Sequence, residues 1–163
     1  MIEFIIYFIV YYIVIYLLHP IIILVHELGH AFFALLFTKG QVNIIIGSKK
    51  SKKYTLKIKR LRISFSKFIF FYSGFVKCSK MPVEKYKRIL IFIGGPISSL
   101  LLILSCSYIL MLIDSLVIEI VLRALIYGSF LTFVITVIPI TYKSKNYKGM
   151  KSDMLNVIHI LRE

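Results

Sequence analysis

Residues 24–33 read LVHELGHAFF and lie within a longer apolar stretch, PIIILVHELGHAFFALLFT (residues 20–38), that has no other titratable side chain. About 20 apolar residues are enough to cross the hydrocarbon core of a bilayer as a helix. Ionisable side chains are costly at that depth and are usually functional there. The stretch is therefore predicted to be a membrane helix that carries a functional site.

The polar residues of this stretch have the spacing of a zinc hydrolase site. On a helix, residues four apart lie on one face, so His26 and His30 can offer their imidazoles to one metal ion. Glu27 can then reach a water at the metal as a general base, and Gly29 leaves room beside the ligands. The pattern H-E-x-x-H also occurs by chance, but its position inside a membrane stretch favours the metal site.

The composition indicates a membrane protein rather than a soluble domain. Hydrophobic residues make up 59% of the 163 residues, and the mean hydropathy is +0.87. Of the 21 Lys and Arg residues behind the net charge of +14, fifteen lie in residues 39–88 and five lie from residue 143 onward. The positive-inside rule then predicts that the basic segment of residues 39–88 and the C-terminus are cytoplasmic. No nucleic-acid partner is expected, because no basic helix or base-stacking module is recognisable.

The apolar runs predict a predominantly α-helical polytopic membrane protein with about four transmembrane helices. The breaks between the runs are His19-Pro20, the basic insertion and Asp114-Ser115. Four passes that start in the cytoplasm would return the chain to that side, in agreement with the charge bias. The predicted helices are residues 2–18, 20–38, 89–113 and 117–140.

The segment between the second and third spans is predicted to be a small β-rich cytoplasmic insertion. Its stretches QVNIIIGS, YTLKIKRLRISF and FIFFYSGFVKC are β-branched and aromatic, which is typical of three or four short strands. The chain accordingly divides into four parts. These are two helices with the HELGH motif (1–38), the insertion (39–88), two further helices (89–140) and a loop with a short C-terminal helix (141–163).

HELGH inside a spanning helix resembles the site-2 protease family, which are zinc metalloproteases that cut within or beside the membrane. A short strand-rich insertion follows the motif helix, as in that family. GGPISS (residues 94–99) looks like the family's Gly-Pro helix-start motif, with Ser99 in place of the usual Asn. TVIPI (residues 136–140) is similar to its Asn-Leu-x-Pro stretch, with Thr136 in place of Asn. The resemblance implies that Pro96, Ser99 and Thr136 belong to a substrate-binding region.

A further element of the resemblance concerns the third zinc ligand. SDM (residues 152–154) is similar to the family's Asp-Gly element, whose Asp binds zinc, although Met154 stands in place of Gly. The resemblance therefore implies that Asp153 is the third ligand. Ser152 before it is a predicted helix start. For Asp153 to reach the zinc, the chain after Pro139 must loop out and return to His26 and His30.

The number of ligands agrees with this assignment. A catalytic zinc usually has three protein ligands and one open position. Asp114 and Glu119 are expected near the outer surface, and His19 and His159 are expected to be surface or interfacial residues. Asp153 is the remaining candidate.

The resemblance implies a zinc-dependent intramembrane endopeptidase that hydrolyses peptide bonds in or near transmembrane segments, with Glu27 as general base and one catalytic Zn²⁺ as cofactor. The expected partners are the lipid bilayer and a membrane protein or peptide substrate, in a multi-pass protein of the cell membrane. The strands of the insertion could present an edge to which an unwound substrate adds. Alternatively, the sheet simply packs on the membrane surface.

Two other functions remain open on the sequence alone. The altered Asn and Gly positions favour a catalytically inactive metal-binding membrane partner or immunity-type protein. A transporter or channel would instead use His26, Glu27 and His30 as a proton relay, without tightly bound zinc. The absence of paired broken helices argues against a transporter. The sequence predicts neither a particular substrate nor a particular oligomeric state.

Overall fold

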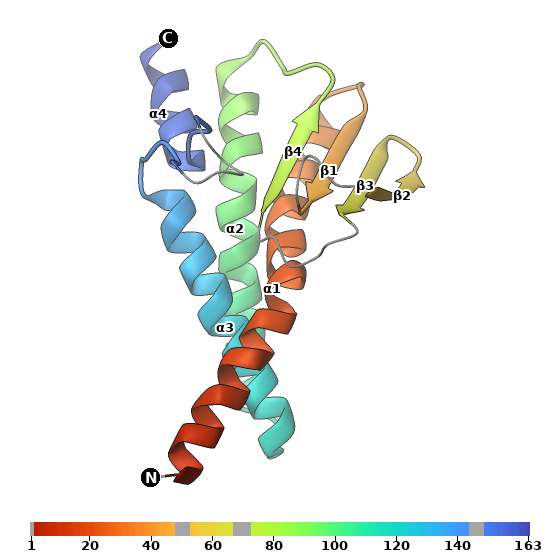
Figure 1. The fold of residues 1–163 in the computed structure, drawn as a ribbon. Helices are drawn as coiled ribbons and strands as arrows, with labels where there is room; N and C mark the ends of the chain where they lie inside the picture. The colour runs from red at the N-terminus through yellow and green to blue at the C-terminus, as the bar shows by residue number, and fades with distance from the viewer. Residues whose placement is uncertain (1, 48–52, 67–72, 144–148) are drawn as a thin grey trace.

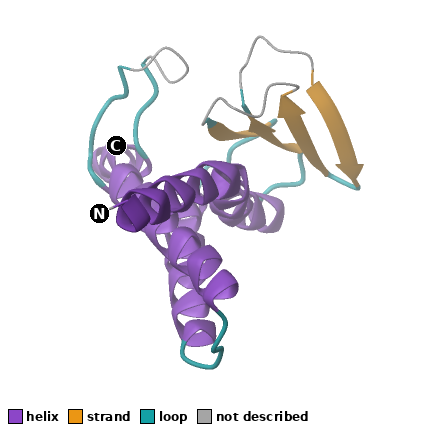
Figure 2. Ribbon diagram, turned by 60° about the horizontal axis from the view of Figure 1, so that its bottom comes forward, coloured by secondary structure: helices purple, strands orange, loops and turns teal. Residues whose placement is uncertain are grey.

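The structure, a computed structural model, describes residues 2–47, 53–66, 73–143 and 149–163 (Figure 1). Three long helices form a bundle, and a small sheet lies beside one half of it (Figures 1 and 2). A short fourth helix packs at the same end as the sheet. The elements within the described residues are α1 (Ile2–Phe37), β1 (Val42–Ile46), β2 (Lys53–Ile58), β3 (Leu61–Ser66), β4 (Gly74–Cys78), α2 (Lys85–Leu110), α3 (Leu116–Val137) and α4 (Asp153–Arg162).

Among the described residues, three helices rather than the predicted four are long and apolar enough to cross a membrane. They are Phe8–Phe37 within α1, the whole of α2 and the whole of α3. The predicted third and fourth spans correspond to α2 and α3, with boundaries shifted by a few residues. The first two predicted spans are a single helix of 36 residues, about 54 Å long at 1.5 Å per residue. That length exceeds the hydrocarbon core of about 30 Å.

The predicted break at His19-Pro20 is wrong because α1 continues through Pro20. A proline removes one helical hydrogen bond, whereas ending the helix there would leave several backbone groups unpaired at both new ends. In apolar surroundings each unpaired group is costly, so membrane helices tolerate an internal proline. The proline signal, which ends helices in water, is therefore weaker in this stretch.

The helix count changes the expected path of the chain. The sheet, α4 and the C-terminal ends of α1 and α3 lie at one end of the bundle, and the start of α1 lies at the other (Figure 1). Three passes leave the two ends of a chain on opposite sides of a bilayer. Three candidate spans would therefore place the two ends of the chain on opposite sides, whereas the four predicted passes would return it to its starting side.

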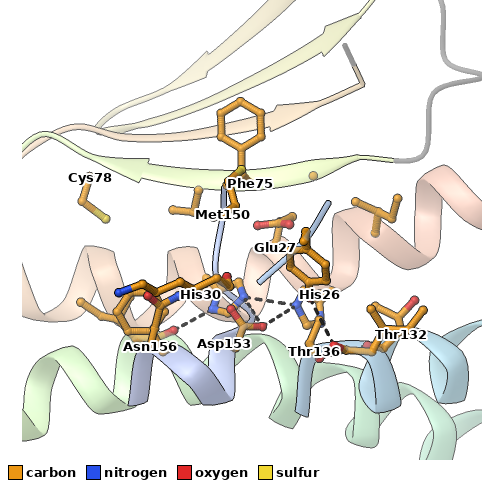
Figure 3. Close-up of a pocket in the computed structure, with 18 of the residues that line it drawn as sticks. His26, Glu27, His30, Phe75, Cys78, Thr132, Thr136, Met150, Asp153 and Asn156 are labelled. Carbon is orange, nitrogen blue, oxygen red and sulfur yellow. Dashed lines mark hydrogen bonds and ion pairs between the residues drawn. The ribbon is translucent and has the colours of Figure 1, made fainter. Parts of the chain in front are cut away.

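The insertion forms a four-stranded sheet with the order β2-β3-β1-β4, which confirms the prediction of three or four strands. β1 runs parallel to β3 and antiparallel to β4. Predicted strand residues 67–72 lie outside the described residues. Alternate β1 residues, including Val42 and Ile44, are fully buried against the small side chains Ala31 and Ala34 of α1. This packing places β4, an edge strand, next to the HELGH part of α1 (Figure 3).

The three-helix path makes a direct prediction about the ends of the chain. Reporter domains fused before residue 1 and after residue 163 should give opposite responses to a reagent or enzyme that acts on one side of the membrane only. The matched control is a fusion in the α2–α3 turn at Asp114, which should behave like the N-terminal fusion. Reporters at both ends that respond alike would contradict the three-span path.

Candidate metal centre

The three polar residues of HELGH are buried in the bundle. His26, Glu27 and His30 are 4%, 6% and 7% exposed, although many large apolar side chains of α1 are more than 40% exposed. The helical repeat explains this, because residues at i, i+1 and i+4 share one side of the helix. That side faces α2, α4 and β4 (Figure 3).

Glycines allow α2 to approach this side of α1 closely. A Cβ atom at Gly29 would overlap the carbonyl oxygen of Gly94, and a Cβ at Gly94 would overlap the carbonyl oxygen of Gly29. The two helices therefore touch through their backbones. A Cβ at Gly95 would overlap the His30 imidazole and lie 2.6 Å from His26 Nε2. Gly95 thus leaves the space that the two imidazoles occupy.

The closeness of α2 lets it orient both imidazoles. His30 Nδ1 lies 2.7 Å from the carbonyl oxygen of Ile91, which can only accept, so this nitrogen carries the proton. His26 Nδ1 lies 2.9 Å from the hydroxyl oxygen of Ser99. The two Nε2 atoms then face one another at 3.2 Å. Such outer contacts to the second ring nitrogen are typical of metal-binding histidines.

Asp153 meets these two nitrogens from a distant part of the chain. Its Oδ2 atom lies 3.2 Å from His26 Nε2 and 3.4 Å from His30 Nε2 (Figure 3). Asp153 is the first residue of α4, and Ser152 caps this helix by accepting from the backbone N–H of Leu155. The prediction of a helix start at Ser152 is confirmed.

Hydrogen bonds join the two ends of the segment that connects α3 to α4. Thr141 pairs with Lys151 in an isolated β-bridge. The Ser152 N–H donates to the carbonyl of Ile140 at 2.9 Å, and the Ile140 N–H donates to Ser152 Oγ at 3.2 Å. These contacts bring the start of α4 to the end of α3. Residues 144–148 of the predicted loop lie outside the described residues.

The spacing of the three side chains suits a zinc ion. A tetrahedral site with bonds of about 2.0–2.1 Å to nitrogen and oxygen has ligand–ligand distances of about 3.3–3.4 Å. The Nε2 and Oδ2 atoms are 3.2–3.4 Å apart, and all three residues offer a ligand atom to one point. Two imidazoles and one carboxylate also form a common donor set of catalytic zinc sites. The residues present therefore fit the metal that the sequence pattern implies.

The charge state of Asp153 also suits a ligand. Burial by itself disfavours the ionised carboxyl group. Coulombic attraction to the His30 imidazole and side-chain hydrogen bonding with both histidines outweigh that effect and lower the pKa of Asp153 to about 2. Asp153 is therefore a carboxylate at neutral pH, which is the form that binds metal.

The cluster lies at the wall of a cavity of about 560 Å³. The cavity is bounded by α1, β4, α3 and α4 and by the segment that leads into α4 (Figure 3). Thr132 and Thr136 of α3 border it on one side, and Phe75 and Val76 of β4 border it on another. Most of the wall is apolar, so an apolar peptide segment fits it better than a charged one.

The three residues predicted to belong to a substrate-binding region occupy different places. Thr136 lines the cavity, and its hydroxyl donates to backbone carbonyls of its own helix. Ser99 is 1% exposed and contacts His26. Pro96 is buried inside α2, which begins at Lys85, so the Gly-Pro element is not a helix start. Neither Pro96 nor Ser99 is among the residues that line the cavity.

Sequence reasoning did not identify several residues that shape the site. Gly95 makes room for the imidazoles, and the Ile91 carbonyl orients His30. Gly74 brings β4 against the acid, because a Cβ there would lie 2.6 Å from Glu27 Oε1. The two adjacent glycines of GGP were a usable signal for a close helix contact. A backbone carbonyl has no such signal, because every residue has one.

A bundle of apolar helices with a buried His-His-Asp cluster and an adjacent Glu is an arrangement typical of membrane metalloenzymes. Comparison with protein-family models identifies the family. The model of peptidase family M50, the site-2 protease family, matches residues 5–162, so the chain belongs to that family. This family is generally zinc-dependent and embedded in membranes. Neither the curated proteins nor the solved structures gave a match.

The helix contact makes a prediction about stability. Gly94→Ala should lower the free energy of unfolding by about 1–3 kcal/mol, because a methyl group there overlaps the α1 backbone and forces the helices apart. Unfolding in one detergent, followed by the loss of helical circular dichroism, measures this change. Leu101→Ala on the exposed side of α2 is the control and should shift stability by less than about 0.5 kcal/mol. If Gly94→Ala is as stable as Leu101→Ala, the contact is not tight.

Proposed function

We propose that this protein is a zinc-dependent intramembrane endopeptidase that hydrolyses peptide bonds in or near transmembrane segments of membrane-bound substrates. The observation that carries the proposal is the convergence of His26, His30 and Asp153 at one point beside Glu27. These residues line one cavity beside three long apolar helices, in a chain that belongs to a peptidase family.

In this proposal His26, His30 and Asp153 hold one Zn²⁺. A zinc ion bound there supplies a Lewis acid that polarises the scissile carbonyl and makes a water molecule more acidic. Three protein ligands would leave one position of such an ion unfilled, as is usual in catalytic zinc sites. The fourth position of a catalytic site is therefore available to water and substrate.

Glu27 is the proposed general base. It follows a ligand directly in α1, lines the cavity and is absent from the ligand cluster itself. Its carboxylate accepts a proton as the water oxygen bonds to the scissile carbonyl carbon, and it returns that proton to the leaving amine as the carbon–nitrogen bond breaks. The products are two peptides, and no covalent bond to the protein forms.

The substrate must present an extended segment to this site. A helical peptide bond is enclosed by its own hydrogen bonds, and unwinding inside a membrane leaves backbone groups that need partners. Strand addition to an exposed sheet edge supplies such partners. β4 is an edge strand and lines the cavity beside Glu27, so it is the proposed docking edge.

The hydrogen-bond pattern of the sheet identifies which groups of β4 are available. The Gly47 N–H donates to the Ser73 carbonyl, and the Ser79 N–H donates to the Gln41 carbonyl, just beyond the two ends of the β1–β4 pairing. Hydrogen-bonded and non-hydrogen-bonded residue pairs alternate along an antiparallel pair of strands, so these two bonds determine which pairs between them are hydrogen-bonded. By this alternation Ile44 and Val76 form a non-hydrogen-bonded pair. The backbone groups of Val76 therefore point away from β1, toward the edge that no described strand occupies.

The same site suggests an orientation in the cell membrane. The basic insertion and the C-terminus are proposed to be cytoplasmic, which follows from the positive-inside rule. Asp153 is the first residue of α4, and α4 and the sheet lie at the same end of the bundle (Figure 1). Water would then reach the cavity from the cytoplasmic side, and the substrate would arrive through the bilayer.

Metal content and cleavage, measured on the same preparations, test the proposed function. Purified wild type should contain about one zinc per chain, and His26→Ala and Asp153→Ala should lose it because two ligands hold zinc weakly. Glu27→Gln should keep the zinc and reduce cleavage of a membrane peptide by at least about 100-fold, because proton transfer is lost.

Each part of this experiment can fail separately. Normal zinc content in Asp153→Ala would remove Asp153 from the ligand set. Glu27→Gln cleavage at the wild-type rate would contradict the protease mechanism. Zinc-containing wild type that cleaves no membrane peptide would support a metal-binding membrane partner instead.

The docking edge is tested by a proline. Val76→Pro should lower kcat/KM by about 2- to 10-fold, because it removes one backbone donor to the substrate without touching the β1–β4 hydrogen bonds. Zinc content should stay at one per chain. Val76→Ala is the matched control, because it loses the side chain but keeps the N–H. Equal kcat/KM for the two variants would contradict strand addition at this residue.

A further inference from the structure

Ser99 has a position that a substrate-binding residue would not have. Its side chain is fully buried between α1 and α2, and it lies on the Nδ1 edge of the His26 ring. Asp153 and His30 lie on the opposite, Nε2 edge. The ring of His26 therefore separates the Ser99 hydroxyl from the ligand cluster and from the cavity that His26 lines.

We propose that Ser99 is a positioning residue for the metal: its hydroxyl oxygen accepts the Nδ1–H of His26 and holds the imidazole in the tautomer whose Nε2 is open to Zn²⁺. The inference rests on the proposed function, because it requires zinc at His26, His30 and Asp153. It assigns Ser99 to the ligand shell rather than to the substrate.

The tautomer of His26 determines whether its Nε2 can bind a metal ion. A neutral ring has one N–H, and an Nε2 lone pair is available to metal only when the proton is on Nδ1. His26 is 4% exposed, so an Nδ1–H without a hydrogen-bond partner would be a buried, unsatisfied donor, which destabilises that tautomer. The Ser99 oxygen, 2.9 Å away, removes that cost.

The two histidines differ in how they are held. His30 is oriented by the Ile91 backbone carbonyl, which no side-chain substitution can remove and which can only accept. A serine hydroxyl can donate as well as accept, so Ser99 is compatible with either tautomer of His26. Zn²⁺ bound at Nε2 would require the proton on Nδ1, and Ser99 would then accept it in a hydrogen bond. A single substitution, at Ser99, can therefore remove the hydrogen-bond partner of His26, whereas none can remove that of His30.

Zinc affinity of the purified full chain in detergent, measured by competition with a chelator at one pH, tests this role. Ser99→Ala should bind zinc about 10- to 100-fold more weakly than wild type, as expected for loss of an outer partner of a ligand. Ser99→Thr keeps the hydroxyl and should remain within about 3-fold of wild type, whereas its isostere Ser99→Val should be as weak as Ser99→Ala. The Thr and Val pair differ only in the hydroxyl, so any packing change is common to both.

Ser129→Ala controls for the removal of a buried serine. Ser129 lies on α3 with 0% exposure, and its hydroxyl has no hydrogen-bond partner among the described residues. This variant should bind zinc like wild type. A Co²⁺-loaded series gives a second readout, because the visible spectrum of bound Co²⁺ should change in Ser99→Ala and Ser99→Val and stay unchanged in Ser129→Ala.

The outcomes separate this inference from the proposed function. Equal zinc affinity of Ser99→Thr and Ser99→Val would overturn the inference, and a raised KM at unchanged affinity would assign Ser99 to substrate binding instead. A wild type that binds zinc but cleaves nothing would overturn the protease, while the affinity comparison would still decide the role of Ser99.

Discussion

The backbone contact between α1 and α2 at Gly29 and Gly94 is the constraint on which the rest of the site depends. Only at this separation can the α1 histidines reach hydrogen-bond partners on α2, which are the Ile91 carbonyl and the Ser99 hydroxyl. The missing side chain of Gly95 then leaves the volume in which the Nε2 atoms meet. Small residues at a helix crossing are a common way to bring membrane helices together. Here the same contact also orients proposed metal ligands.

The third ligand depends on a different set of interactions at the end of the bundle. Ser152 caps α4, and it also exchanges hydrogen bonds with Ile140 at the end of α3. Val157 and Ile160 bury one face of α4, and an ion pair between Arg88 and Glu163 joins α4 to α2 at 2.6 Å. Asp153 is thus held by a helix with its own anchors. A short amphipathic helix can supply a ligand with the accuracy that a free loop would lack.

Much of the site was predictable from the sequence, because its signals are local. The i,i+4 spacing of His26 and His30, the acid between them and the helix start at Ser152 all concern neighbours in the chain. The meeting of Asp153 with the histidines was expected only from the family resemblance and from the ligand number. The structure now brings these side chains within 3.4 Å. That proximity supports the proposed ligand set.

The parts that could not be predicted depend on surroundings or on non-local contacts. Pro20 signals a helix end in water, but in an apolar environment the remaining backbone hydrogen bonds keep α1 intact. Ser99 was assigned to substrate by its place in a motif, whereas its partner, His26, is 73 residues away in the chain. The edge position of β4 arises from a crossover, since β1 pairs with β3 and β4 rather than with β2. Strand periodicity contains no information on that order.

In this protein, apolar helices bury the cluster of His26, His30 and Asp153, and the edge strand β4 lies beside it. The most direct test of the proposed zinc ligands is X-ray absorption at the zinc edge of the purified wild-type protein. We expect two imidazole nitrogens and at least one further oxygen at about 2.0–2.1 Å from the zinc, with no sulfur neighbour. A sulfur neighbour at about 2.3 Å would contradict the proposed ligands, because Cys78 also lines the cavity and would then have replaced Asp153 or a histidine as a ligand.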